Sequence, residues 1–273
     1  MKKRKGNLQS FLRSAFSAFA ILFAFAVSVY LYVNVMGNPV NFEGGNPEGH
    51  PLPGNYLGII YKGGWVVPVL ITCVMLSLIF GVERIITLGR AKGRKGLNTF
   101  VFKLQNLLSG DKIEEAIEAC NKQRGSLANV VHAGLIRYRD LQKDKTLTND
   151  QKIESIEKSL EEATALEVPM LSRNMVIFSS LASLSVLIGL FGTVLGMIRA
   201  FAALAQAGAP DALALSTGIS EALINTATGI LGSVLAILGY NFFSSKIDSY
   251  AYKIDEASFS LVETFAESLK EGS

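Results

Sequence analysis

Glu221 is the residue of this sequence whose type and surroundings most strongly suggest chemistry. It lies among small and apolar residues in the stretch 212–240, which is long enough to cross a lipid bilayer. A carboxylate without a partner costs several kcal/mol inside a membrane, so such a residue usually marks a path for ions or protons. Glu221 lies about 12 Å from the start of its segment, at 1.5 Å per residue, too deep for its short side chain to reach the interface. We therefore expect a role in proton movement, with a structural hydrogen bond to a neighbouring helix as the alternative.

The segments 175–204 and 213–243 each carry one face of small and polar residues. At about 100° per residue, large apolar side chains take the opposite face of both helices. Small residues spaced four apart let membrane helices approach closely, so helix packing is the simpler interpretation of the glycines. The hydroxyl and amide side chains can border a polar path, or they can bond back to a carbonyl one turn earlier. These faces contain Gly189, Gly192, Thr193 and Gly196 in the first segment, and Gly218, Asn225, Thr226, Gly229 and Gly232 in the second, with Glu221 at the edge of the second.

The composition predicts an all-α integral membrane protein with four transmembrane helices. Hydrophobic residues make up 49% of the chain and charged residues 18%, and the apolar residues are concentrated in runs. Four of these runs, at 14–36, 64–81, 175–204 and 213–243, reach about 20 residues, the length that spans a bilayer. The first run follows the basic stretch 2–5, but its length of about 23 residues exceeds the apolar core of a signal peptide, and no small-x-small cleavage site closes it. We therefore expect it to be a retained anchor.

Positive charges predict the orientation of these helices. Lysine and arginine are concentrated near the N-terminus and in 84–95, whereas the loop 37–63 carries only Lys62. By the positive-inside rule, both termini and the region between the second and third helices are cytoplasmic. The expected parts are a basic stretch with the first anchor (1–37), an external loop (38–63), the second membrane helix (64–81), a cytoplasmic helical domain (82–173), the third membrane helix (174–206), a short external loop (207–212), the fourth membrane helix (213–244) and a cytoplasmic C-terminal helix (245–273).

Helix start and stop signals predict that the cytoplasmic domain is helical. Asp111 begins a sequence like a capping box, in a helix that Gly125 is expected to end. Thr148 and Gln151 form a second such start. The helix that follows can continue into the third membrane helix, with a kink expected at Pro169. We expect the charged residues along this helix to be solvated faces or subunit contacts rather than catalytic groups.

Three motifs resemble those of the ExbB/TolQ branch of the MotA/TolQ/ExbB proton channel family. They are GLFGTVLGM at 189–197, GISEALINTATG at 218–229 and YNF at 240–242. The cytoplasmic sequences GDKIEEAIEAC at 110–120 and SLANVVHAGL at 126–135 are also similar to those of the family. The glycine-threonine and glutamate-threonine motifs at this spacing are specific to the family.

The resemblance implies a proton-motive-force-driven motor in the inner membrane of a bacterium. It implies a homopentamer whose lumen is lined by the last two membrane helices and encloses a dimer of a single-span partner of the ExbD/TolR type, which supplies the proton-carrying aspartate. Thr193 and Thr226 correspond to the family's lumen-facing threonines, and Glu221 corresponds to its membrane glutamate. Such a motor drives a TonB-like or TolA-like protein, and the sequence does not separate these two systems. The chain departs from the three-span members by its N-terminal anchor and by Asn225, which is expected to add a polar lumen contact where a small residue is common.

Other functions fit the sequence less well. A MotA-like stator subunit also has four spans, but it resembles this chain less around Glu221. A non-conducting membrane scaffold would also use small-residue faces, and it predicts that Glu221→Gln leaves proton-driven work intact. We expect no enzyme activity, metal or cofactor, because the chain has neither a P-loop nor a nucleophile elbow, and its two cysteines form no metal-ligand or redox pattern. The net charge of +3 fits an anionic leaflet beside the spans, so no nucleic-acid partner is expected.

Overall fold

The computed structural model describes residues 17–94, 96–110, 112–142, 146–205 and 211–271. Within these residues the chain is helical apart from turns and one isolated bridge between Phe42 and Pro51. Among the described residues, four helical runs are long and apolar enough to cross a membrane, and they lie within Ser17–Met36, Val66–Leu108, Asn149–Leu204 and Ala212–Ser268. The expected all-α membrane fold is therefore confirmed. The basic stretch at the N-terminus and most of the expected loop 207–212 lie outside the described residues.

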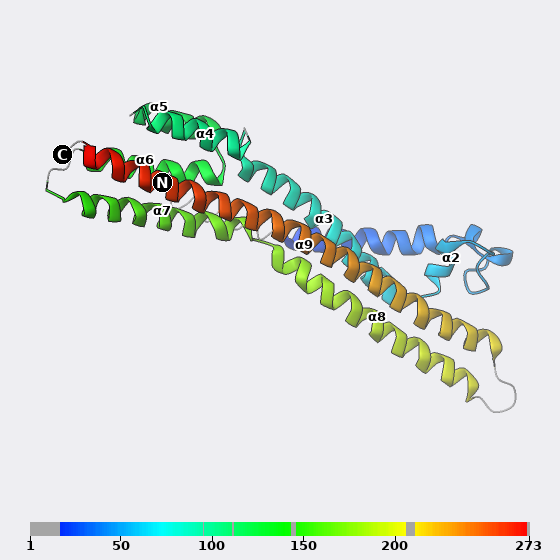
Figure 1. Cartoon of the computed structure of the whole chain (residues 1–273). Helices are drawn as coiled ribbons and strands as arrows, with labels where there is room; N and C mark the ends of the chain where they lie inside the picture. The colour runs from blue at the N-terminus through cyan, green and yellow to red at the C-terminus, as the bar shows by residue number, and fades with distance from the viewer. Residues whose placement is uncertain (1–16, 95, 111, 143–145, 206–210, 272–273) are drawn as a thin grey trace. The chain divides into compact units, whose positions relative to one another are not determined.

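The helices follow one another along the chain as Figure 1 shows. The first helix spans Ser17–Met36 and ends in a π-helical stretch, η1 (Leu31–Met36). The connection to the next long helix contains two 3-10 turns, η2 (Pro39–Asn41) and η3 (Glu43–Gly45), and the short helix α2 (Tyr56–Tyr61). The remaining helices are α3 (Val66–Lys92), α4 (Leu97–Leu108), α5 (Ile113–Gln123), α6 (Ser126–Gln142), α7 (Asn149–Leu171), α8 (Met175–Leu204) and α9 (Ala212–Glu271). The chain divides into two compact units, Met1–Gly81 with Val176–Tyr240, and Val82–Met175 with Asn241–Ser273.

In the first unit, the N-terminal helix packs through small side chains. Ala20, Ala24 and Ser28 recur every four residues, so they share one face, and all three are buried. The Ser28 hydroxyl donates a hydrogen bond to the Pro68 carbonyl of α3. Small residues allow this close approach, which is typical of helices packed in a membrane.

Side-chain hydrogen bonds hold the connection between the first helix and α3. The Asn41 amide group donates to the carbonyls of Val35 and Met36, at 2.7 and 2.9 Å, and its carbonyl oxygen accepts from Asn55 at 2.9 Å. Asn55 in turn caps the N-terminus of α2. This connection therefore has a defined course up to the start of α3.

Helix α8 and the first half of α9 lie side by side in the same unit (Figure 1). Their large apolar side chains point away from each other, as the exposure of Leu187, Phe191, Leu223 and Leu231 shows. Ser185 and several glycines are buried on the opposite faces. The two faces that the helical periodicity predicts are thus present on both helices.

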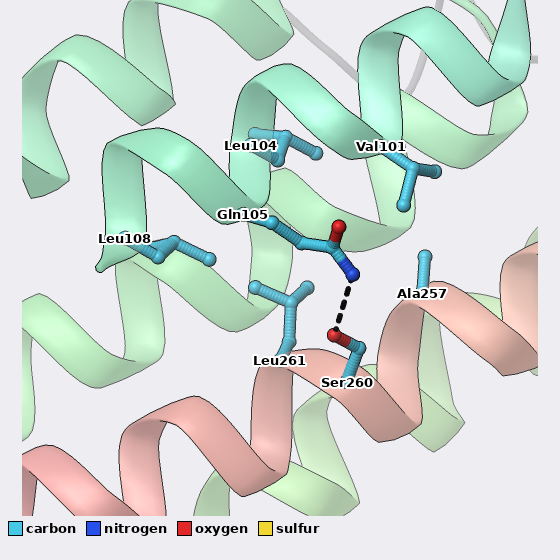
Figure 2. Close-up of a pocket in the computed structure, with 7 residues that line it drawn as sticks. All are labelled: Val101, Leu104, Gln105, Leu108, Ala257, Ser260 and Leu261. Carbon is cyan, nitrogen blue, oxygen red and sulfur yellow. Dashed lines mark hydrogen bonds between the residues drawn. The ribbon is translucent and has the colours of Figure 1, made fainter.

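The second unit contains the helices α4, α5, α6 and α7 together with the C-terminal part of α9. The ring of Tyr138 in α6 stacks on Phe265 with the ring centroids 4.0 Å apart, and the Tyr138 hydroxyl lies 2.7 Å from the Ser268 hydroxyl. Figure 2 shows a small hollow between α4 and α9, in which the Gln105 amide donates to the Ser260 hydroxyl at 3.1 Å. Apolar side chains from both helices line it, namely Val101, Leu104, Leu108, Ala257 and Leu261.

The expected helix starts and stops in this unit have different outcomes. The capping box at α7 is confirmed, because the Gln151 backbone N–H donates to the Thr148 hydroxyl and the Thr148 N–H donates to the Gln151 side chain. The stop near Gly125 is also confirmed, since α5 ends at Gln123 and Gly125 has a φ of +94°. The expected start at Asp111 lies outside the described residues, and α5 begins at Ile113.

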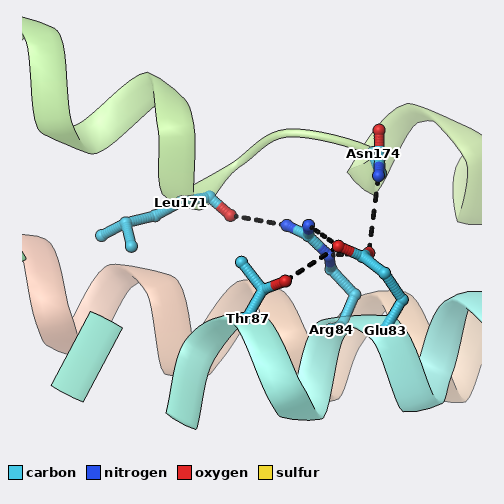
Figure 3. Close-up of polar contacts among 5 residues, drawn as sticks. All are labelled: Glu83, Arg84, Thr87, Leu171 and Asn174. Atoms are coloured by element: carbon cyan, nitrogen blue, oxygen red, sulfur yellow. Dashed lines mark hydrogen bonds and ion pairs between the residues drawn. The ribbon is translucent and has the colours of Figure 1, made fainter. Parts of the chain in front are cut away.

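The kink expected at Pro169 is wrong in its position. Pro169 lies inside α7, which continues to Leu171, and the helix breaks after it, where Asn174 has a φ of +66°. Asparagine tolerates this left-handed conformation. Figure 3 shows the polar contacts on the two sides of the break: the guanidinium of Arg84 donates to the Leu171 carbonyl at 3.1 Å, and Glu83 accepts from the Asn174 amide at 3.4 Å. The buried cation of α3 satisfies the C-terminal carbonyl of α7, which is where a helix dipole favours positive charge.

Candidate functional site

The backbones of α8 and α9 touch through their glycines. A Cβ atom added to Gly196 would lie 2.6 Å from the Ala222 nitrogen and 2.7 Å from the Gly218 carbonyl oxygen. One added to Gly189 would lie 2.8 Å from the Asn225 carbonyl oxygen and 3.0 Å from the Gly229 Cα. Real Cβ atoms do not come this close to backbone atoms, so these positions require glycine. The close approach brings the short polar side chains of the two helices into direct contact.

Thr193 of α8 and Thr226 of α9 meet at this interface. Their hydroxyl oxygens are in hydrogen-bond contact, and both also lie near the Ala222 carbonyl, at 3.3 Å for Thr193 and 3.2 Å for Thr226. The Thr193 hydroxyl lies 3.1 Å from the Gly189 carbonyl as well. Each hydroxyl has one proton to donate and two lone pairs to accept with. The pair can therefore be hydrogen-bonded in more than one direction, which is the arrangement that a proton relay needs.

Glu221 has a charged partner, so the expectation of an unpaired carboxylate is wrong. The Nη1 atom of Arg199 lies 2.8 Å from Oε1 and 2.7 Å from Oε2 of Glu221. Glu221 is only 2% exposed, whereas the Arg199 side chain is 54% exposed. The pair joins α8 to α9 and offsets part of the cost of a lone charge in a membrane segment.

Sequence reasoning missed Arg199, although the sequence contains a signal for it. Arg199 is the only charged residue in the sequence of α8, and Glu221 is the only one in the α9 sequence up to Tyr240. Two single charges of opposite sign on neighbouring membrane segments commonly pair. At 100° per residue Arg199 lies within about 20° of Gly192, so it shares the small-residue face of its helix, as the pair requires.

Asn225 and Glu221 both contact the turn that precedes α3. The Asn225 amide donates to the Gly63 carbonyl at 2.9 Å, and Asn225 is fully buried. Gly64 has a φ of +73°, and a Cβ atom there would lie 2.5 Å from Oε1 of Glu221. The turn therefore lies directly against the carboxylate. Asn225 is expected to add a polar lumen contact, but inside this chain its amide group is used to hold the turn.

The described residues offer little for other chemistry. Among them, no group of three or more His, Cys, Asp or Glu side chains is placed to hold a metal ion. The thiols of Cys73 and Cys120 are free and buried. Burial raises the pKa of Cys120 to about 12, so its thiol stays protonated and unreactive at neutral pH. Among the described residues, the candidate site is therefore the group of polar side chains between α8 and α9, namely Thr193, Thr226, Glu221 and Arg199.

Comparison with known proteins identifies a matching family and several relatives. The MotA/TolQ/ExbB proton channel family model matches residues 125–256. The Tol-Pal system protein TolQ of Haemophilus influenzae is 27% identical over 211 residues, which are 74% of this chain and 91% of that protein. The biopolymer transport protein ExbB of Pseudomonas putida is 29% identical over 161 residues, which are 57% of this chain and 47% of that protein. A putative ExbB-like transport protein of Synechocystis is 38% identical over 89 residues, 32% of this chain and 42% of that protein. The chain thus spans most of the TolQ relative and about half or less of the two ExbB relatives.

Proposed function

Residues 125–256 belong to the MotA/TolQ/ExbB proton channel family, and from this we propose that the chain is the multi-span subunit of a proton-driven motor that energises outer-membrane transport or envelope processes. The similarity to TolQ and ExbB supports an energiser subunit of the ExbB/TolQ branch, in a multi-pass membrane protein. We place it in the bacterial inner membrane with both termini cytoplasmic, because the positive charges lie at the N-terminus and after the second apolar run.

The observation that carries this proposal is the polar interface of α8 and α9. It contains a hydroxyl pair, Thr193 and Thr226, and an ion pair, Arg199 and Glu221. Ionisable groups inside membrane segments usually serve ion or proton pathways. Hydroxyls that can donate and accept in either direction are suited to passing a proton.

The spacing of the two pairs argues for a second protein in the path. Glu221 and Thr226 are five residues apart on α9, and Arg199 and Thr193 are six apart on α8. At 1.5 Å per residue, the pairs are separated by about 8 Å along the helices. A single hydrogen bond does not cover that length, so a proton passing between the two pairs needs an intermediate group or water. A carboxylate on a single-span partner of the ExbD/TolR type could fill this role, and we further propose, from the family resemblance alone, a homopentamer that encloses a dimer of that partner.

Assembly with such a partner can be measured. We expect that co-expression of the full chain with the single-span membrane protein encoded beside its gene, followed by native mass spectrometry in mild detergent, gives five copies of the chain and two of the partner. A monomer that retains no partner contradicts the motor. An oligomer without a partner supports the membrane scaffold instead. Genes for a TonB-like or a Pal-like protein next to the chain's own gene would separate the two types of energised system.

The role of the carboxylate is tested by proton-driven work in cells that depend on the chain. We expect Glu221→Gln to assemble normally and to lose that work, because the variant can neither carry a proton nor pair as an anion. Glu162→Gln is the matched control. It makes the same chemical change at an exposed position of α7. Equal work from both variants would show that Glu221 has only a structural role.

A further inference from the structure

The turn between α2 and α3 covers the Glu221 carboxylate from one side. Gly64 packs its backbone against the carboxylate in a left-handed conformation that disfavours a side chain, and a Cβ atom there would also lie 3.1 Å from the carboxyl carbon. Asn225 holds the preceding residue, Gly63, by its hydrogen bond to α9. The carboxylate is consequently 2% exposed, although its partner Arg199 is half exposed. The turn therefore covers the carboxylate, and its contact partner Arg199 is the member of the pair that remains half exposed.

The position of this turn depends on the N-terminal helix. The Tyr61 carbonyl accepts two hydrogen bonds, one from the Gly64 N–H at 3.1 Å and one from the Tyr32 hydroxyl at 3.1 Å. The Tyr32 and Tyr61 rings also stack, with centroids 4.7 Å apart. Gly37, directly after the first helix, packs on the Tyr61 ring so closely that a Cβ atom would lie 2.6 Å from it. One carbonyl thus connects the first helix to the residue that covers Glu221.

The N-terminal helix is itself fixed to α3. Its small-residue face is buried along Ala20, Ala24 and Ser28, and Ser28 donates to the carbonyl of Pro68. Pro68 lies four residues after Gly64. The first helix therefore contacts the chain on both sides of the turn, through Tyr61 before it and through Pro68 after it.

We propose that the N-terminal helix is a positioning element for Glu221. Through Tyr32 and Tyr61 it holds the Gly63–Gly64 turn over the carboxylate, so that a proton or a partner's group reaches Glu221 only from the side of Arg199. The geometry stands on its own, and the purpose of the positioning rests on the proposed proton-driven function. Tyr32, Tyr61 and Gly64 act through Glu221 and are positioning residues.

Carbodiimide labelling of Glu221 tests this inference without any measurement of proton-driven work. The reagent modifies protonated carboxyl groups that it can reach, and peptide mass spectrometry assigns the modified residue. The rate is measured at several pH values in membranes that contain the full chain, with the exposed Glu162 as the internal reference. We expect slow labelling of Glu221 in the unmodified chain because both the turn and the ion pair protect it.

Two pairs of variants separate the turn from general effects of substitution. Gly64→Ala places a methyl group against the carboxylate and should displace the turn. Gly54→Ala is its control, because Gly54 has a φ of +80° but no atom within 4 Å of an added Cβ. Tyr32→Phe removes only the hydroxyl that reaches Tyr61, and Tyr30→Phe, at an exposed position on the same helix, is its control.

We expect Tyr32→Phe to raise the labelling rate of Glu221 about fivefold, the factor that corresponds to one neutral hydrogen bond. Gly64→Ala should raise it at least as much, and neither control should change it. If folded Tyr32→Phe and Gly64→Ala both label at the rate of the unmodified chain, the turn does not protect Glu221 and the proposal is overturned. If only Gly64→Ala labels faster, the turn covers Glu221 without help from the N-terminal helix, which also overturns it. If Gly64→Ala does not fold, the labelling rate of Tyr32→Phe alone tests the proposal, and a rate equal to that of the unmodified chain overturns it. Full proton-driven work by Glu221→Gln would refute the proposed function. It would not change the labelling rates, so the two proposals can fail separately.

Discussion

The contact between α8 and α9 predicts that a single methyl group at Gly196 destabilises the protein. The three atoms nearest to the added Cβ of Gly196→Ala are all backbone atoms of α9, the Ala222 nitrogen at 2.6 Å, the Gly218 oxygen at 2.7 Å and the Ala222 Cα at 3.0 Å. No side chain can move aside, so the helices must separate. Overpacking of this kind costs about 1 to 3 kcal/mol, and alanine recovers up to about 1 kcal/mol of helix propensity. Backbone atoms cannot rotate away as a side chain can, so we take the upper end of the overpacking cost. After the gain in helix propensity is subtracted, we expect the free energy of unfolding to fall by about 2 kcal/mol.

The matched control for this substitution is Gly81→Ala. Gly81 also lies within a long apolar helix, α3, but an added Cβ there meets no atom within 4 Å. This variant should therefore gain about 0.5 to 1 kcal/mol from helix propensity alone. The free energy of unfolding of both variants is measured by titrating the purified chain from mild detergent into a denaturing one. Equal stability of the two variants would refute the close contact of α8 and α9.

Three further predictions concern charged and titratable side chains. Arg199→Gln and Glu221→Gln should each lower the free energy of unfolding. In a double-mutant cycle, the loss in the double variant should be smaller than the sum of the two single losses by about 2 kcal/mol. Additive losses would exclude the ion pair. Burial raises the pKa of Cys120 from 9.0 to about 12, so its contribution to stability is complete below pH 9 and is lost as the pH rises toward 12. The free energy of unfolding should therefore fall less steeply over this range in Cys120→Ala than in the unmodified chain. Alkylation of Cys120 in the folded chain at neutral pH would contradict the prediction. Arg84→Met should cost about 2 kcal/mol, since it removes the buried cation that pairs with half-buried Glu83 and leaves the Leu171 carbonyl without its donor, whereas Arg90→Met, at an exposed position of the same helix, should change stability little.

The features that could be predicted from the sequence depend on a single helix or on neighbouring residues. Helical periodicity separates buried Ser185 from exposed Leu187 because both positions follow from 100° per residue on one helix. The capping box of Thr148 and Gln151 was recognised because its two hydrogen bonds join residues three apart. Runs of apolar residues likewise indicated the membrane fold, since the length of a span is a local property.

The features that could not be predicted depend on contacts between distant segments. Arg199 pairs with a residue 22 positions away on the next helix, so the pair emerges only when the single charges of two segments are compared and not from the neighbourhood of either residue. Asn225 reaches the Gly63 carbonyl across 162 positions, so a residue that resembled a lumen contact is used to hold a turn. The helix break follows the guanidinium of Arg84, 87 positions from the carbonyl that it binds, rather than the local signal at Pro169. The predicted division into membrane and cytoplasmic parts and the orientation of the termini remain predictions.

Proton uptake into liposomes tests the central claim most directly. The full chain is reconstituted with the single-span protein encoded beside it, a proton-motive force is imposed, and internal pH is followed with a dye. The account predicts uptake by the unmodified complex and a loss of at least about tenfold, typical of removing a proton-transfer group, both in Glu221→Gln and in a variant with valine in place of Thr193 and Thr226. Uptake by these assembled variants at the rate of the unmodified complex would contradict the account, as would an assembled unmodified complex that takes up protons no faster than empty liposomes.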